Sequence, residues 1–208
     1  MSPANRLGRY LRWFGTFLAV LLAGAAVCFI VIYAPAVAVV AGLYVLSSAA
    51  YSLWLKRIAL VEILLFIWFY LARVMVGGAV AGVHLSSWLT LSVIFLALFL
   101  VVAKRYSERR SGRPRAVLNQ YPERFLEGML FISAALVMVC YGLYSILGTE
   151  SAWTVYSTLP VLAGVMRYLQ LVFERDDIEH PEKLIFRDNG LLLCSLAWFA
   201  CVIAVFYL

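Results

Sequence analysis

Seven long apolar runs, separated by short charged or turn-forming connections, constrain the fold of this chain more than any other feature. Their approximate bounds are 13–33, 35–53, 58–82, 85–103, 125–147, 152–173 and 190–208. A helix needs roughly 20 mostly apolar residues to cross a bilayer, so these runs use nearly all of the 208 residues and leave no room for a separate soluble domain. Backbone groups in hydrocarbon need partners within their own segment, which favours helices. We therefore expect an all-α integral membrane protein with about seven transmembrane helices, and a single transmembrane domain over 1–208.

Composition agrees with this interpretation and excludes several functional classes. The chain is 65% hydrophobic and 13% charged, whereas soluble domains are about 45–50% apolar and about 25% charged. All four cysteines lie inside apolar runs without Cys-x-x-Cys spacing, so we expect neither a disulfide framework nor a zinc site. The first run follows three arginines, as a secretory signal would, but it lacks a convincing cleavage site and should remain a span.

Basic residues alternate between the two sides of this predicted bundle. The N-terminal segment carries three, the second connection two, the fourth connection seven and the sixth connection three, while the connections on the opposite side carry none. The remaining two of the 17 basic residues, Arg73 and Arg167, lie within predicted spans. Lys and Arg accumulate on the cytoplasmic side of membrane proteins. This asymmetry predicts a multi-pass protein of the cell (inner or plasma) membrane with a cytoplasmic N-terminus and an external C-terminus, and it argues against a nucleic-acid partner.

Arg73 is unusual because it lies in the middle of a predicted span, where a charge costs at least about 2.5 kcal/mol on insertion scales. Glu62 precedes it by eleven residues, a separation that returns to nearly the same helix face. Both side chains are therefore predicted to point into one polar cavity that opens toward the cytoplasm. The alternatives are a buried structural ion pair, or an arginine whose head group extends to the interface.

A second group of charges begins the fourth connection. Lys104 and Glu108 share a helix face at i,i+4, and the neighbouring cations suit a phosphate or pyrophosphate, although a purely topogenic cluster would look similar. Arg167 either lines the same cavity or reaches the lipid head groups. His84 and His180 have no second ligand at metal spacing, and we interpret both as solvated residues.

The order of these motifs resembles the UbiA-type intramembrane prenyltransferases. Tyr51 and Lys56 lie in a segment similar to the family's Tyr-x-x-x-Leu-Lys, followed by Glu62 where an aspartate is usual and then by Arg73. Within the superfamily the chain looks most like the decaprenyl-phosphate phosphoribosyltransferase branch, on the segments 103–108, 167–172, 181–184 and 187–188. The resemblance implies the last seven helices of a nine-helix bundle.

One motif of that family is missing from the chain. The family binds magnesium pyrophosphate through Asn-Asp-x-x-Asp-x-x-x-Asp after its second helix, and the 208 residues contain no such string. The expectation is therefore an N-terminally truncated chain that lacks the first two helices and shows little activity alone, unless a second polypeptide supplies them. The resemblance implies Mg²⁺ as cofactor, with Glu62 and Glu108 as the candidate ligands.

Three functions remain open at this point. The favoured one, implied by the resemblance, is phosphoribosyl transfer from phosphoribosyl pyrophosphate to decaprenyl or another polyprenyl phosphate, for cell-wall arabinan precursors. The second is an aromatic prenyltransferase of quinone pathways, and the third is a non-enzymatic degenerate paralogue or small transporter. No catalytic residue is assigned. The residues expected to bind the phosphorylated substrates, a lipid and a small molecule from the cytoplasm, are Tyr51, Lys56, Arg73, Lys104, Arg105 and Arg167.

Overall fold

The described part of the chain is helical throughout. A computed structural model describes residues 35–111, 120–149, 151–174, 184 and 187–207, and the predicted first span, 13–33, lies outside them. These residues form α2 (Pro35–Leu53), η1 (Leu55–Arg57), α3 (Val61–Ala81), α4 (Ser87–Arg110), α5 (Glu123–Leu147), η3 (Ala152–Ser157), α6 (Thr158–Glu174) and α8 (Asn189–Tyr207). No strand is present among them, which confirms the predicted all-α class.

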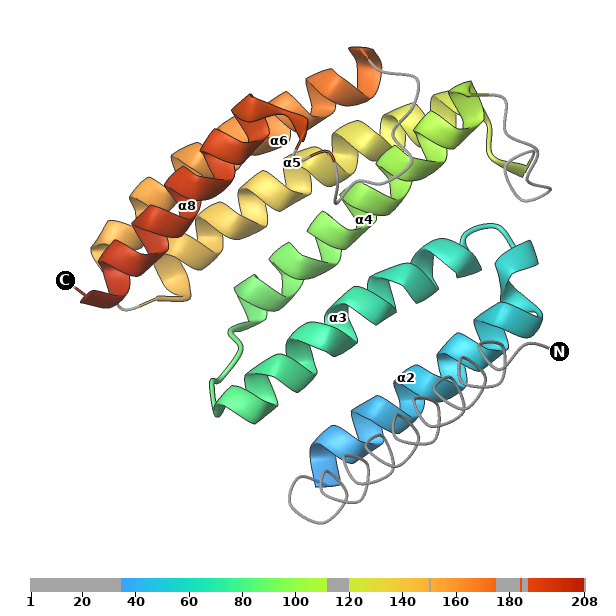
Figure 1. Cartoon of the computed structure of the whole chain (residues 1–208), viewed down its shortest axis with the longest axis horizontal. Coiled ribbons are helices and arrows are strands. Elements are labelled where there is room, and N and C mark those ends of the chain that lie inside the picture. Colours follow the sequence, from blue (N-terminus) through green and yellow to red (C-terminus); the bar gives the residue numbers. More distant parts are fainter. Residues whose placement is uncertain (1–34, 112–119, 150, 175–183, 185–186, 208) are drawn as a thin grey trace, which may run out of the picture.

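Consecutive helices lie side by side and alternate in direction (Figure 1). The connection between α2 and α3, the C-terminal end of α4 and the C-terminal end of α6 lie at one end of the bundle. The connection between α3 and α4 lies at the opposite end, together with the C-terminal end of α8. This arrangement brings the basic connections of the sequence to the same end.

The core is centred on α4, which packs against α3 on one side and α5 on the other. Phe99 and Val102 of α4 are fully buried, and Leu126 and Leu130 of α5 are completely inaccessible. The ring of Phe99 also lies 5.2 Å from that of Tyr168, which joins α6 to the same core. Large apolar side chains on the outer faces of the helices remain exposed, as expected for a bundle whose surroundings are hydrocarbon.

Six of the seven predicted spans have a helix in the structure. Four helical stretches are long and apolar enough to cross a membrane: Val61–Ala81, Ser87–Arg110, Glu123–Leu147 and Trp153–Glu174. The apolar helices Val37–Leu53 and Asn189–Val205 are shorter. The last of the four long stretches begins as the 3₁₀-helix η3 and continues as α6.

One predicted boundary is wrong. The fourth connection was expected to begin after Ala103, but α4 continues to Arg110. The added residues are mostly good helix formers, and the helix ends only at Ser111, before Gly112. Lys104, Arg105 and Glu108 therefore lie on α4 itself, and this places the candidate site on regular structure.

Candidate functional site

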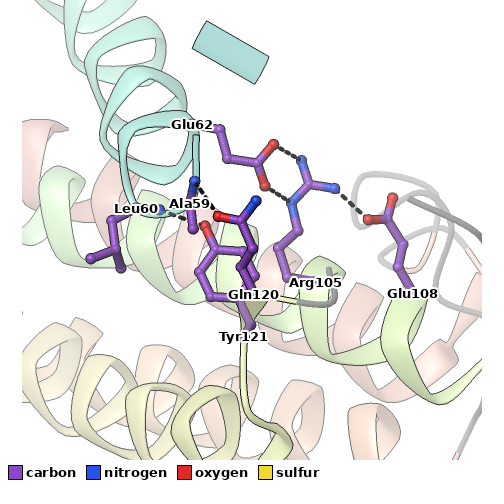
Figure 2. A network of polar contacts seen from close by, with 7 residues as sticks. All are labelled: Ala59, Leu60, Glu62, Arg105, Glu108, Gln120 and Tyr121. Carbon is purple, nitrogen blue, oxygen red and sulfur yellow. Dashed lines mark hydrogen bonds and ion pairs between the residues drawn. The ribbon is translucent and has the colours of Figure 1, made fainter. Parts of the chain in front are cut away.

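A cluster of three buried charges lies at the basic end of the bundle. Glu62 is in the first turn of α3, while Arg105 and Glu108 are one turn apart near the end of α4. Arg105 Nε lies 2.8 Å from Glu62 Oε1, and Arg105 Nη1 donates to Glu108 Oε2. The three residues are only 1% to 4% exposed. Figure 2 shows the two carboxylates on opposite sides of one guanidinium.

Side chains that are so strongly shielded from solvent remain charged only when they are paired with an opposite charge. Removing an ion from water costs several kcal/mol, and charge-assisted hydrogen bonds of good geometry offset that cost. The Arg105 guanidinium also lies 5.7 Å from the centre of the Phe66 ring, one turn along α3 from Glu62. The cluster thus joins the start of α3 to the end of α4.

Glu62 and Arg73 were expected to point into one polar cavity, but the structure gives them different partners. They are eleven residues apart, which corresponds to about 16 Å along a helix axis, and they contact different helices, Glu62 the helix α4 and Arg73 the helix α2. Arg73 is exposed, and its Nη2 donates to the hydroxyl of Tyr44 on α2 at 3.1 Å. Its guanidinium also lies 5.6 Å from the centre of the Tyr70 ring. Glu62 and Arg73 therefore occupy two separate polar positions, because helical periodicity fixes neither the depth of a side chain nor the neighbouring helix that it contacts.

The two connections at the basic end are tied together beside the charge cluster. The Tyr121 hydroxyl accepts the backbone N–H of Leu60 at 2.7 Å. Gln120 accepts the N–H of Ala59 at 3.4 Å through Oε1 (Figure 2). Its Nε2 donates to the Arg57 carbonyl at 3.3 Å. Burial raises the pKa of the Tyr121 phenol above its usual value. Neither residue was predicted as part of the site, because nothing in the sequence relates residues 120 and 121 to a turn 61 positions earlier.

A third polar contact joins α6 to the start of α8. Arg167 donates to Asp188 through Nη2 at 2.8 Å and Nε at 3.2 Å, and to Gln170 at 2.9 Å. Asp188 also accepts the N–H of Leu191 at 3.0 Å, as an N-cap residue does. The hydrogen bond from Arg167 lowers the pKa of Asp188 from 3.8 to about 2. An aspartate just before an apolar run is a known N-cap signal, so this role was accessible from sequence.

The remaining predicted residues differ in their accessibility. Lys56 is exposed on η1, and Lys104 is half-buried near the end of α4. Tyr51 lies within α2, where its ring contacts those of Phe66 and Phe69 at 5.3 and 6.3 Å. Arg110 donates to the Phe173 carbonyl at 3.0 Å and so links the ends of α4 and α6.

A magnesium site does not assemble from the described residues. Glu62 and Glu108, the predicted ligands, are both bonded to Arg105, which already balances their charge. No group of three His, Cys, Asp or Glu side chains suited to a metal ion occurs in the part of the chain that the structure describes. Magnesium uses one or two carboxylates besides waters and substrate oxygens, and here the two carboxylates serve as counter-ions of an arginine. The described residues therefore do not fit the predicted metal site.

Together these features define a membrane-embedded, all-α protein with a basic end that contains a buried, ion-paired cluster. The described basic residues at that end are Lys56, Arg57, Lys104, Arg105, Arg109, Arg110, Arg124 and Arg187. No protein-family model matches the chain.

Comparison with curated proteins identifies specific relatives. The decaprenyl-phosphate phosphoribosyltransferase of Mycobacterium tuberculosis (strain H37Rv) is 32% identical over 197 residues, which cover 91% of this chain and 65% of that protein. The enzymes of the same name from Mycolicibacterium smegmatis and Corynebacterium glutamicum are each 27% identical, over 94% of this chain and over 66% and 61% of their own lengths. The chain is a homologue of these proteins, and the resemblance inferred from its motifs is confirmed. It spans just under two thirds of the length of the relatives it matches.

Proposed function

We propose that this chain forms the membrane-embedded part of an enzyme that transfers a phosphoribosyl group from phosphoribosyl pyrophosphate to decaprenyl phosphate or a related polyprenyl phosphate. The observation that carries this proposal is the similarity to decaprenyl-phosphate phosphoribosyltransferases across more than nine tenths of the chain. The same relatives favour this reaction over aromatic prenyl transfer.

The chemistry of this transfer places strong demands on charge. An oxygen of the lipid phosphate forms a bond to the anomeric carbon of the ribose, and pyrophosphate leaves with the bonding electrons. Donor, acceptor and leaving group all carry negative charge, so fixed cations are needed to bring them together. The basic end of the bundle offers such cations beside the membrane surface, where a lipid phosphate is also found.

We propose two classes of role for the cations at this end. Lys56 and Lys104 are accessible, so they contact the phosphorylated substrates directly. Arg105 is enclosed by Glu62 and Glu108, so it holds the end of α4 in position and acts on the substrates through Lys104 beside it. Arg73, far along α3, is assigned to the lipid substrate.

Orientation and partners complete the proposal. The basic end faces the cytoplasm, as the positive-inside rule requires, and phosphoribosyl pyrophosphate arrives from that side. A segment that carries the acidic Asn-Asp-x-x-Asp motif, as a second polypeptide, would supply the carboxylates for magnesium that the described residues do not offer.

A transfer assay tests the proposal. Membranes that contain the chain are incubated with radiolabelled phosphoribosyl pyrophosphate, magnesium and decaprenyl phosphate, alone and together with a two-helix segment that carries the acidic motif. We expect label in the lipid extract of the combined sample, and none when decaprenyl phosphate is omitted. Absence of labelled lipid in both samples, under conditions in which the M. tuberculosis relative produces it, would contradict the proposed reaction.

The lysines offer a sharper test of the site. Lys56→Gln and Lys104→Gln should each raise KM for phosphoribosyl pyrophosphate by about tenfold, since a charge-assisted hydrogen bond contributes about 1.5 kcal/mol or more. The matched variants Lys56→Arg and Lys104→Arg keep the charge and should retain most of the affinity. If the Gln and Arg variants raised KM equally at both positions, the phosphates of phosphoribosyl pyrophosphate would have to bind elsewhere.

A further inference from the structure

Leu60 adopts a backbone conformation that is rare for a leucine. Its φ is 66° and its ψ is −44°, and it is the non-glycine residue with positive φ in the described chain. The N–H of Val61 donates to the carbonyl of Ala59 at 2.8 Å, directly across Leu60. These values describe a γ-turn of the positive-φ form, which is uncommon and strained. Such strain persists only where neighbouring groups hold it in place.

The groups that hold this turn come from the connection before α5. Tyr121 is only 2% exposed and accepts the N–H of Leu60 itself, while Gln120 accepts the N–H of Ala59. Two successive backbone donors of the turn are thus bound by two successive side chains of a distant segment. The stacked contact of Tyr121 with Phe125, at 6.3 Å between ring centres, anchors it to the first turn of α5.

The turn determines where α3 begins, and therefore where Glu62 lies. Leu60 is the residue that precedes the first turn of α3, and Glu62 follows two positions later. Glu62 then contacts Arg105 on α4. A continuous series of contacts runs from Tyr121 through Leu60 and Glu62 to Arg105, as Figure 2 shows.

We propose that Tyr121 is a positioning residue for the basic end of the bundle. Its hydroxyl holds the strained turn at Leu60, the turn fixes the start of α3, and Glu62 in turn fixes Arg105 and the end of α4 that carries Lys104. This inference rests on the proposed function, because it assigns the cations at that end to phosphate binding. Tyr121 would thus affect the affinity for the substrate without contacting the substrate itself.

The test uses the full chain in lipid nanodiscs, together with the two-helix segment of the transfer assay, and the single-atom change Tyr121→Phe. We expect faster amide hydrogen exchange in residues 55–64, and affinity for phosphoribosyl pyrophosphate about fivefold weaker, as the loss of one hydrogen bond predicts. Adding Leu60→Gly to Tyr121→Phe should restore much of the affinity, because glycine adopts positive φ without strain. A residue that only stabilised the fold would not show this rescue.

Tyr141→Phe is the matched control. Tyr141 is a buried tyrosine at the opposite end of the bundle, and its hydroxyl accepts a hydrogen bond from Trp198 at 2.7 Å. This variant should lower thermal stability but leave both the affinity and the exchange of residues 55–64 unchanged. If Tyr121→Phe changes neither measurement, or changes exchange but not affinity, the positioning role is overturned. If the unmutated chain does not bind phosphoribosyl pyrophosphate even with the two-helix segment present, the proposed function fails, and unchanged exchange in Tyr121→Phe then also rejects the role of the hydroxyl at the turn.

Discussion

Glu62 and Arg105, 43 residues apart in the chain, form a buried ion pair that joins the start of α3 to the end of α4. Arg105 also bonds Glu108 on its own helix, so its guanidinium is held from two sides. A guanidinium presents its donors in a fixed plane, and this geometry restricts the rotation of α4 relative to α3. The consequence is a defined direction for the neighbouring cations, Lys104 among them.

Arg105→Met should destabilise the protein strongly. Removing one partner of a buried ion pair typically costs about 3–5 kcal/mol, because the remaining charge stays buried without compensation. Unfolding in mixed micelles with increasing dodecyl sulfate measures this free energy. Arg109→Met, one turn further along the same helix, removes the same charge from a half-buried position and should cost less than about 1 kcal/mol. Similar costs for the two variants would show that the Arg105 cluster contributes little to stability.

Asp188 should make stability depend on pH in the acid range. Its pKa is lowered from 3.8 to about 2 by the hydrogen bond from Arg167. A depressed pKa contributes stability that is complete above the unfolded value, near 4, and is lost as the pH falls through about 2. Melting curves of the protein between pH 2 and pH 6 should therefore show a decline at the acid end.

Asp188→Asn separates the ion pair from the helix cap. Asparagine remains a good N-cap acceptor for the Leu191 N–H, but it carries no charge to pair with Arg167. The variant should be less stable than the unmutated chain at pH 6, and the difference should shrink as the pH approaches 2. A constant difference over the whole range would exclude the carboxylate as its origin.

Arg73→Leu should leave the fold intact but weaken binding of decaprenyl phosphate, the lipid substrate to which Arg73 is assigned. The side chain is exposed and makes its hydrogen bond to Tyr44, so its loss leaves no buried carboxylate without a partner. Binding of decaprenyl phosphate to the chain in nanodiscs, compared with the unfolding curve, measures the two effects separately. Tyr44→Phe is the control, since it removes the hydrogen bond and keeps the charge. Unchanged affinity in Arg73→Leu would make Arg73 a structural residue of the contact between α2 and α3.

Membrane orientation is testable with reporter fusions. Fusions within residues 109–115 should report a cytoplasmic position, and fusions after Leu208 an external one, because the connections on one side carry the basic residues. The reversed pattern at both positions would overturn the proposed orientation of the basic end. It would also remove the route by which a soluble phosphorylated donor reaches Lys56 and Lys104.

The sequence by itself determined the class of the protein, the approximate positions of the six described long helices, and its relatives. Apolar runs long enough to cross a bilayer can satisfy their backbone only as helices, so the segment 35–53 was predicted with the bounds that α2 has. Short motifs such as Tyr51 to Lys56 were sufficient to indicate the homologous enzymes, because a motif is recognised from the order of its residues and requires no knowledge of tertiary contacts. The seven-residue error at the end of α4 arose because charge was taken as the end of a span, although charged residues continue a helix readily.

Only the tertiary structure decided which charges are partners. Helical periodicity placed Glu62 and Arg73 on one face of α3, but it carries no information about the facing helix, which supplies Arg105. The same limit hid Tyr121 and the strained turn at Leu60, since a backbone N–H 61 residues away leaves no trace in local sequence. Burial decides these partnerships: a charge that loses water must find its counter-charge nearby in space, and which residues are near is a property of the packed bundle.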